Sequence, residues 1–233
     1  MLIDLHNHTL PRSSDSSLRV EELILQAKTR GLDGVCLTEH DNTWNSKEVE
    51  RISKDNGFLV IAGMEVTTDH GHILVFGVNK FSYEMFTAER LRRIVEEEGG
   101  VMVLAHPFRR SLYKLYSHGH TPSPNGGMSW AAQDHDYLNL VEAVEVLNGT
   151  GSPHQNAFSL EVAQRLGLPG TGGSDAHHRA EIAACVTKFE RDIAGLSELM
   201  NELRSGEFSA LDLRIGGEST RRRRFSLGAR HSH

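Results

Sequence analysis

Short apolar runs alternate along this chain with longer segments in which apolar residues recur every three or four positions. Runs of this length, rich in Val, Ile and Leu, are typical of buried β-strands. They lie at 1–5, 35–37, 58–62, 73–76, 101–105, 140–147 and 184–189. The amphipathic segments predict helices at 19–30, 44–56, 87–98, 154–166 and 196–204. Because strand and helix alternate throughout, the pattern favours an α/β fold built on a parallel sheet.

The chain is predicted to form one domain. With 233 residues, of which 38% are hydrophobic, it can bury a substantial core, and neither an internal repeat nor a linker divides it. We assign residues 1–213 to a single barrel domain. Residues 214–233 include four consecutive arginines, Arg221 to Arg224, and are expected to form a basic, disordered tail.

Charge and composition limit the classes of binding partner and the cellular compartment that we expect for this protein. The formal net charge of −6 argues against long nucleic acid, although the arginine tail leaves that question open. No apolar run approaches the roughly eighteen residues of a membrane span, and the N-terminus lacks the pattern of a secretion signal. Cys36 and Cys185 each lie in an apolar run, as expected for buried thiols in a reducing compartment. We therefore expect a cytoplasmic protein without a membrane partner, in an oligomeric state that the sequence leaves open.

The first chemical feature is a His-x-His at the end of the first strand. Alternate residues of a strand share a face, so His6 and His8 point the same way, with Asp4 behind them. Two imidazoles backed by a carboxylate can hold a divalent metal ion. Taken alone, the pair could equally be two surface histidines near a terminus.

Further nitrogen and oxygen donors stand at or near the ends of the other predicted strands. They are His40 with Asp41, Glu65, His72, His106, Asp175 and His177, to which the first loop adds Asp15. In (β/α) barrels the carboxyl ends of the strands form one rim, where active sites lie. These donors are too many for one ion and include no thiolate, so they suit two or three ions that share a bridging carboxylate.

Together these motifs resemble those of the PHP (polymerase and histidinol phosphatase) family. They are Asp-Leu-His-Asn-His-Thr at 4–9, Thr-Glu-His-Asp at 38–41, Gly-Met-Glu-Val at 63–66, Ala-His-Pro-Phe-Arg at 105–109 and Gly-Ser-Asp-Ala-His at 173–177. Each motif is weak alone, but the combination is specific and covers about residues 1–205. The resemblance implies a distorted (β/α)7 barrel, a trinuclear metal centre and the activity of a small metal-dependent phosphoesterase.

The resemblance also implies three ligand sets that share a bridging Glu65. One ion would be held by His6, His8, Glu65 and Asp175, a second by Asp15, His40 and His177, and a third by Glu65, His72 and His106. Manganese, iron or zinc suits such donors. Many members of the family carry a histidine where Asp15 stands. This difference is expected to influence which metal occupies the second site. Asp4 is expected to orient an imidazole from behind.

The amidohydrolases are a second family to consider, because they also begin with His-x-His on a barrel strand. They usually bridge their metals through a modified lysine in mid-chain. This chain has no lysine at a plausible strand end, and His177 fits the PHP pattern better. We therefore rank the amidohydrolases second.

The predicted ligands suggest phosphate chemistry. Several cations in one pocket lower the pKa of a bridging water and neutralise the charge on a phosphate. Arg109, which closes the Ala-His-Pro-Phe-Arg motif, is the candidate for binding the phosphate through two hydrogen bonds. Arg110 and Arg12 are weaker candidates. The proton for the leaving group could come from His178, from His70 or from a metal-bound water.

These features favour hydrolysis of a small phosphorylated metabolite or nucleotide. An exonuclease that trims short RNA or DNA ends is the alternative enzyme. A regulatory module that binds metal without turnover is the alternative outside enzymes, and the complete ligand set argues against it. Residues 110–136 follow the strand of His106 and carry Tyr113, Tyr116, Trp130 and a Gly126-Gly127 pair. We interpret them as a lid that selects the leaving group.

Overall fold

A computed structural model describes residues 1–109 and 136–214 of the chain. The predicted lid lies outside the described residues except for Asp136, and the predicted tail lies outside them except for Arg214. The lid and the tail therefore stay predictions.

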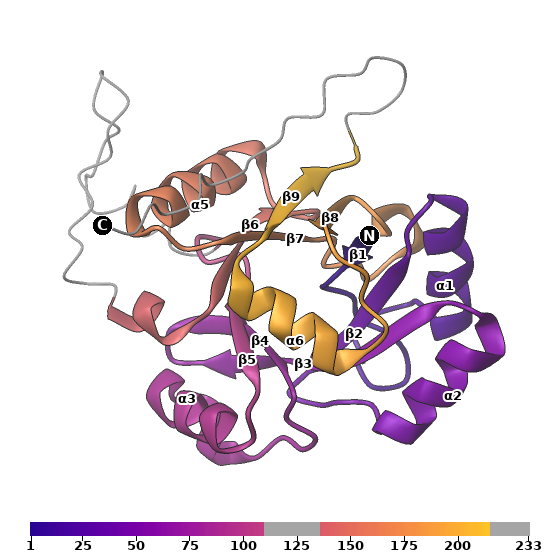
Figure 1. The fold of residues 1–233 in the computed structure, drawn as a ribbon, viewed down its shortest axis with the longest axis horizontal. Helices are drawn as coiled ribbons and strands as arrows, with labels where there is room; N and C mark the ends of the chain where they lie inside the picture. The colour runs from indigo at the N-terminus through magenta and orange to yellow at the C-terminus, as the bar shows by residue number, and fades with distance from the viewer. Residues whose placement is uncertain (110–135, 215–233) are drawn as a thin grey trace.

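In the described ranges, nine strands form one sheet that curls into a nearly closed barrel (Figure 1). In chain order they are β1 (Leu2–Asp4), β2 (Gly34–His40), β3 (Leu59–Thr68), β4 (Gly71–Phe76), β5 (Val101–Leu104), β6 (Ala143–Asn148), β7 (Gly170–Gly173), β8 (Cys185–Phe189) and β9 (Phe208–Asp212). Their order across the sheet is β7-β6-β5-β4-β3-β2-β1-β8-β9. This mixed α/β barrel confirms the predicted fold class.

Five α-helices accompany the sheet in the part of the chain that the structure describes. They are α1 (Val20–Thr29), α2 (Ser46–Asn56), α3 (Ala88–Glu97), α5 (Pro153–Leu166) and α6 (Leu196–Ser205), each close to its predicted range. Helix α1 packs on β2, α2 on β3, α3 on β5 and α5 on β6 (Figure 1). None of these helices has the length and apolar character that crossing a membrane requires.

Local sequence explains where two of the helices begin and end. The Asn45 side chain accepts hydrogen bonds from the first turn of α2, and Ser152 and Gln155 form a capping box at the start of α5. Gly57 and Gly167 end these helices with φ of +52° and +65°, a conformation that glycine adopts without steric cost. Because capping depends on neighbours in the chain, these ends could be predicted from sequence.

The sheet is mixed rather than parallel, which corrects the prediction. Strands β1, β2 and β3 pair in parallel, as do β5, β6 and β7. Strand β4 runs antiparallel to β3 and β5, and β8 runs antiparallel to β1 and β9. Only Asp69 and His70 separate β3 from β4, whereas a parallel crossover needs about a dozen residues. The apolar pattern could not reveal this, because a buried strand reads alike in both directions.

Strands β7 and β9 have no counterpart among the predicted elements. Strand β7 is Gly-Thr-Gly-Gly, a sequence of low β propensity. A Cβ on Gly172 would lie 2.5 Å from the backbone oxygen of Val186 on β8. The glycine is therefore needed for the close approach of β7 to β8, and the same feature hides β7 from a propensity analysis.

The barrel closes between β7 and β8 through a side chain. The buried Thr187 hydroxyl on β8 accepts a hydrogen bond from Gly172 N at 3.0 Å and donates one to Gly172 O at 2.9 Å. Beyond β7, the backbone of residues 175–176 pairs with that of residues 6–8. The segments that follow β1 and β7 are thereby held side by side at one end of the barrel.

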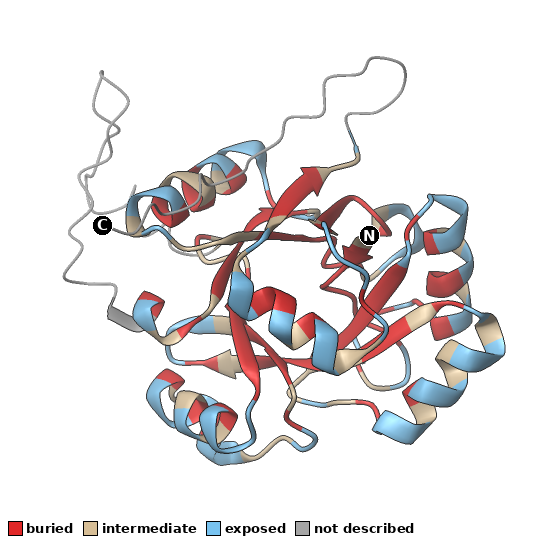
Figure 2. Ribbon diagram, viewed as in Figure 1, coloured by how far each residue is buried: buried red, intermediate tan, exposed pale blue. Residues whose placement is uncertain are grey.

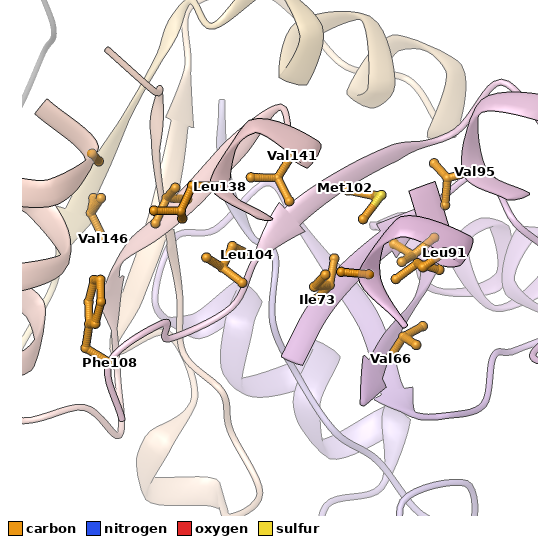
Figure 3. Packing of buried hydrophobic residues seen from close by; sticks show 14 of the residues in the cluster. Val66, Ile73, Leu91, Val95, Met102, Leu104, Phe108, Leu138, Val141 and Val146 are labelled. Carbon is orange, nitrogen blue, oxygen red and sulfur yellow. The ribbon is translucent and has the colours of Figure 1, made fainter. Parts of the chain in front are cut away.

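Most residues of the barrel strands are buried (Figure 2), and buried apolar residues of the strands and helices form the core. Figure 3 shows the cluster to which Ile73, Leu91 and Met102 belong, between α3 and the strands β4 and β5. A different cluster fills one end of the barrel, where Leu199 and Leu203 of α6 pack against inward-facing strand residues. Helix α6 crosses the barrel there (Figure 1), so the polar groups gather at the opposite end.

Replacing Thr187 by valine removes the hydroxyl with little change in side-chain size. The buried N–H and C=O of Gly172 then lose their partner, so we expect the free energy of unfolding to fall by about 1–3 kcal/mol. Urea denaturation followed by circular dichroism measures the change. Thr29→Val is the control, because Thr29 is exposed at the end of α1, and its effect should stay within about 0.5 kcal/mol. Equal losses in the two variants would show that Thr187 does not close the barrel.

Candidate metal centre

Glu65 stands at the centre of a group of histidines. It lies on β3, and its side chain is 1% exposed. Its two carboxylate oxygens lie within 3.3 Å of one ring nitrogen from each of five histidines, His6, His8, His40, His72 and His106. The shortest of these distances, 2.8 Å, joins Oε1 to His72 Nδ1. One buried carboxylate thus faces five imidazoles.

Strand directions explain why these side chains meet. His40 ends β2 and pairs in register with Glu65 on β3, and His106 follows the end of β5. Because β4 runs the opposite way, His72 near its start reaches the same rim. Glu65 itself lies within β3, which continues to Thr68. This corrects the prediction that Glu65 follows its strand.

The segments after β1 and β7 bring further candidates to this rim. Asp175 Oδ1 lies 3.3 Å from His8 Nε2 and 3.6 Å from His6 Nε2. The two Nε2 atoms are 3.1 Å apart, so His6 and His8 project to the same side, as their alternation predicts. The backbone hydrogen bond from Asp175 N to His6 O, at 2.8 Å, holds the two segments together.

Asp15 and His177 lie on the solvent side of the group. Asp15 Oδ2 is 3.1 Å from His40 Nε2 and 3.4 Å from His177 Nε2, and the Asp15 side chain is 55% exposed. Partial burial raises the pKa of Asp15, but His40 and His177 outweigh it and hold that pKa below its usual value. All nine residues predicted as ligands therefore meet at one end of the barrel.

The group shifts the pKa values of its members in different directions. Burial opposes the charge of Glu65, but the imidazoles, His6 foremost, outweigh burial and hold the pKa of Glu65 well below its usual range. Burial also opposes protonation of His6, yet nearby carboxylates, Glu145 foremost, raise the pKa of His6 well above its usual value. For His8 burial prevails and lowers the pKa to about 4. A neutral His8 at pH 7 offers a nitrogen lone pair.

The donors fit metal ions better than they fit a set of hydrogen bonds. Glu65 Oε2 is buried and has no hydrogen-bond partner among the described residues, although two ring nitrogens lie within 3.3 Å of it. Between the facing Nε2 atoms of His6 and His8 there is room for one proton at most. Donor atoms within 4.8 Å of one another occur in His8, His40 and His177, in His6, His8 and Asp175, and in His40, Glu65 and His72. Lone pairs that converge in a buried pocket suit a divalent cation.

Arg109 contacts this group through Asp175. Its Nη2 lies 2.5 Å from Asp175 Oδ2 and 3.1 Å from Asn148 Oδ1, and it also contacts the Thr150 hydroxyl. The Arg109 side chain is 34% exposed. Within the described ranges, the hydrogen bonds of its guanidinium all involve Nη2, so Nη1 and Nε remain for another ligand.

The other basic candidates have different surroundings. The Arg12 guanidinium lies 4.6 Å from the centre of the Trp44 ring. The exposed His178 ring contacts a serine hydroxyl of the first loop at 2.9 Å, and His70 is exposed in the turn between β3 and β4. Arg110 lies outside the described residues. The general acid and the weaker phosphate ligands therefore stay predictions.

Glu39, Glu145 and Asn148 are buried beside the cluster, although the sequence analysis did not assign them to the site. Glu145 Oε1 lies 3.0 Å from His6 Nδ1, and the Asn148 amide donates to Glu145 and Asp175. Glu145 and Asn148 belong to β6, all of whose residues are buried. A glutamate within an apolar strand is the signal that could have identified the site, because a buried carboxylate needs partners.

Glu39 supports the His8 side of the cluster. Its carboxylate accepts hydrogen bonds from Thr9 N at 2.8 Å, the Thr9 hydroxyl, Ser13 Oγ at 2.5 Å and Trp44 Nε1 at 2.8 Å. Ser13 Oγ is also 3.3 Å from His8 Nδ1. Because the one hydroxyl hydrogen of Ser13 goes to Glu39, its oxygen is free to accept from His8.

Comparison with known proteins agrees with this geometry. The family model described as "PHP domain" matches residues 4–166, and the model described as "PHP-associated" matches residues 153–208. A protein of Caldicellulosiruptor bescii described as "Probable phosphatase" is 24% identical over 206 residues, which cover 78% of this chain and 82% of that protein.

Solved structures share the fold. A two-domain protein from Bacteroides vulgatus, described as containing a "predicted PHP-like metal-dependent phosphoesterase", aligns with a TM-score of 0.59 and 19% identity, over 90% of this chain and 64% of that one. An amidohydrolase from Chromobacterium violaceum with bound sulfate and no metal aligns with a TM-score of 0.54 and 20% identity, over 90% of this chain and 97% of that one. At such identities the likeness shows the fold alone.

Replacing Glu39 by glutamine keeps the shape of the side chain but puts an amide where donors already approach. One oxygen of Glu39 accepts from Trp44 Nε1 and the other from Thr9 N, and neither donor can turn away. We expect the free energy of unfolding to fall by about 1–3 kcal/mol, measured by urea denaturation. Glu50→Gln is the control, because Glu50 is exposed on α2 and should lose no more than about 0.5 kcal/mol. Parent-like stability of E39Q would exclude this role of Glu39.

Proposed function

We propose that this chain, which belongs to the PHP domain family, is a metal-dependent phosphoesterase acting on a small phosphorylated metabolite or nucleotide. The observation that carries the proposal is the buried carboxylate of Glu65 within 3.3 Å of five imidazole nitrogens. The relative described as a probable phosphatase supports the same reaction class.

The proposed ligand sets are those that the family resemblance implies for residues that meet at the rim. His6, His8, Glu65 and Asp175 would hold one ion, Asp15, His40 and His177 a second, and Glu65, His72 and His106 a third. Nitrogen and oxygen donors of this kind suit manganese, iron or zinc. When bound, such ions lower the pKa of a coordinated water and offset negative charge on a phosphate.

Arg109 is proposed to bind the phosphate of the substrate. Its Nη2 is held by Asp175 at 2.5 Å, which fixes the guanidinium beside the cluster. Its remaining N–H groups would donate to phosphate oxygens, which guanidinium groups bind through paired hydrogen bonds. A phosphate in this position would lie near Asp175, one of the nine proposed ligands.

Turnover by the reconstituted protein tests this proposal. The purified chain is loaded with manganese, iron or zinc and assayed on an aryl phosphate, with the metal-free protein as reference. Metal-dependent release of phosphate is expected, and a panel of phosphorylated metabolites then ranks the substrates. A short oligonucleotide that competes strongly would favour the exonuclease alternative. Tight metal binding without turnover of any phosphoester would favour the regulatory module and contradict the proposal.

Glu65→Ala should remove more than one metal ion per chain, because Glu65 is proposed to bridge. Metal content after reconstitution and dialysis is measured by elemental analysis. Glu161→Ala is the control, since Glu161 lies on the surface of α5 and pairs only with Arg165 among the described residues. Loss of a single ion, or of none, would show that Glu65 does not bridge.

Arg109→Ala should lower kcat/KM for a phosphoester. We expect the loss to correspond to about 1.5–3 kcal/mol of transition-state stabilisation, the usual range for a hydrogen bond to a charged group. Steady-state kinetics measures this, and the metal content should match the parent. Arg90→Ala is the control, because Arg90 is 61% exposed on α3. A variant that loses metal but keeps its kcat/KM per bound metal would instead assign Arg109 to holding Asp175.

A further inference from the structure

Glu145 lies directly behind one of the proposed ligands. It is 1% exposed and occupies the third position of β6. Its Oε1 lies 3.0 Å from His6 Nδ1. Its Oε2 accepts hydrogen bonds from His106 N at 2.8 Å and from Asn148 Nδ2 at 2.9 Å. Glu145 therefore connects the side chain of one proposed ligand with the backbone of another.

The orientation of Asn148 is determined by its other contacts. Its Oδ1 faces two groups that can only donate, namely Arg109 Nη2 at 3.1 Å and Thr150 N at 3.1 Å. The amide nitrogen must then point the other way, toward Glu145 and toward Asp175 Oδ2 at 3.3 Å. Because His106 N and Asn148 Nδ2 are both donors, the second oxygen position of residue 145 has to be an acceptor.

With Glu145 ionised, this arrangement determines which nitrogen of a neutral His6 carries the proton. A carboxylate only accepts hydrogen bonds, so His6 Nδ1 must donate to Glu145 Oε1. When the imidazole is neutral, its lone pair is then on Nε2. That atom faces the cluster, 3.3 Å from Glu65 Oε1 and 3.6 Å from Asp175 Oδ1.

Strand β7 passes close to Glu145 and His6, where only a glycine fits. A Cβ on Gly173 of β7 would lie 2.5 Å from Glu145 Oε1 and 2.5 Å from His6 Cβ. Any larger residue at position 173 would push the carboxylate and the imidazole out of place. The glycine is therefore an independent indication that the contact between Glu145 and His6 is built into the barrel.

We infer that Glu145 is a positioning residue that keeps His6 in the Nδ1–H form and aims His6 Nε2 at the metal. The inference rests on the proposed function, because it assumes that His6 is a metal ligand. Residues behind a metal-binding imidazole fix its tautomer and orientation and typically change metal affinity 10- to 100-fold.

Glu145→Gln tests this inference, because the protein itself dictates how the new amide lies. His106 N and Asn148 Nδ2 require the amide oxygen, so the amide nitrogen must face His6 Nδ1. His6 is then forced into the Nε2–H form, with a proton where the metal should bind. The experiment titrates the full-length protein with Zn²⁺ against a competing chelator. It also records nitrogen–proton correlation spectra of the imidazoles in zinc-loaded protein.

The expected result has two parts. In the parent, His6 shows a protonated Nδ1 and a metal-bound Nε2. In E145Q, Nε2 is protonated and one zinc site weakens roughly 10- to 100-fold. Glu142→Gln is the matched control, because Glu142 precedes the same strand and accepts from Met102 N at 2.8 Å, away from the histidines. It should keep the parental spectrum and affinity.

Each contrary outcome has a distinct meaning. A parental zinc affinity and a protonated Nδ1 in E145Q would overturn the inference while leaving the proposed function standing. Metal on His6 Nδ1 in the parent would also overturn it, by making Glu145 a candidate ligand together with His6 and His106. A parent that binds no zinc, manganese or iron would instead overturn the proposed function.

Discussion

A carboxylate buried inside a barrel needs positive charge or donors around it, and this requirement organises one whole end of the molecule. Glu65 meets it with five imidazoles. These rings are themselves crowded: the His8 ring lies 4.1 Å from that of His40 and 4.3 Å from that of His177, centre to centre. Protonating several of them at once would be unfavourable. Divalent cations would resolve the conflict, because they neutralise carboxylates and bind neutral imidazoles.

The two ends of the barrel differ in the kind of side chain that they contain. Helix α6 fills one end with apolar side chains, and the opposite end carries the polar cluster. The antiparallel β4 contributes to this asymmetry. The two-residue turn between β3 and β4 returns the chain at the rim, so His72 lies next to Glu65 with 2.8 Å between their nearest atoms. A long parallel crossover would place the start of the next strand at the far end.

His6 and His8 belong to the same motif, but different groups contact their imidazole rings. His6 faces the carboxylate of Glu145 directly, and the nearby carboxylates raise the pKa of His6 against the effect of burial. His8 reaches Glu39 only through the Ser13 hydroxyl, and burial lowers its pKa to about 4. Burial and the neighbouring carboxylates together set how basic each imidazole is.

The sequence by itself determined the helices, most of the strands and the nine candidate ligands, because periodicity, capping and residue type are local properties. Only the tertiary structure decided which way β4 and β8 run, since a buried strand reads alike in either direction. It alone revealed β7, in which Gly172 is explained by the closeness of Val186 on β8. It also assigned Glu39 and Glu145, because the donors that make a buried carboxylate useful come from distant parts of the chain. Residue types indicated the candidate ligands, but only the folded structure showed which side chains hold them in place.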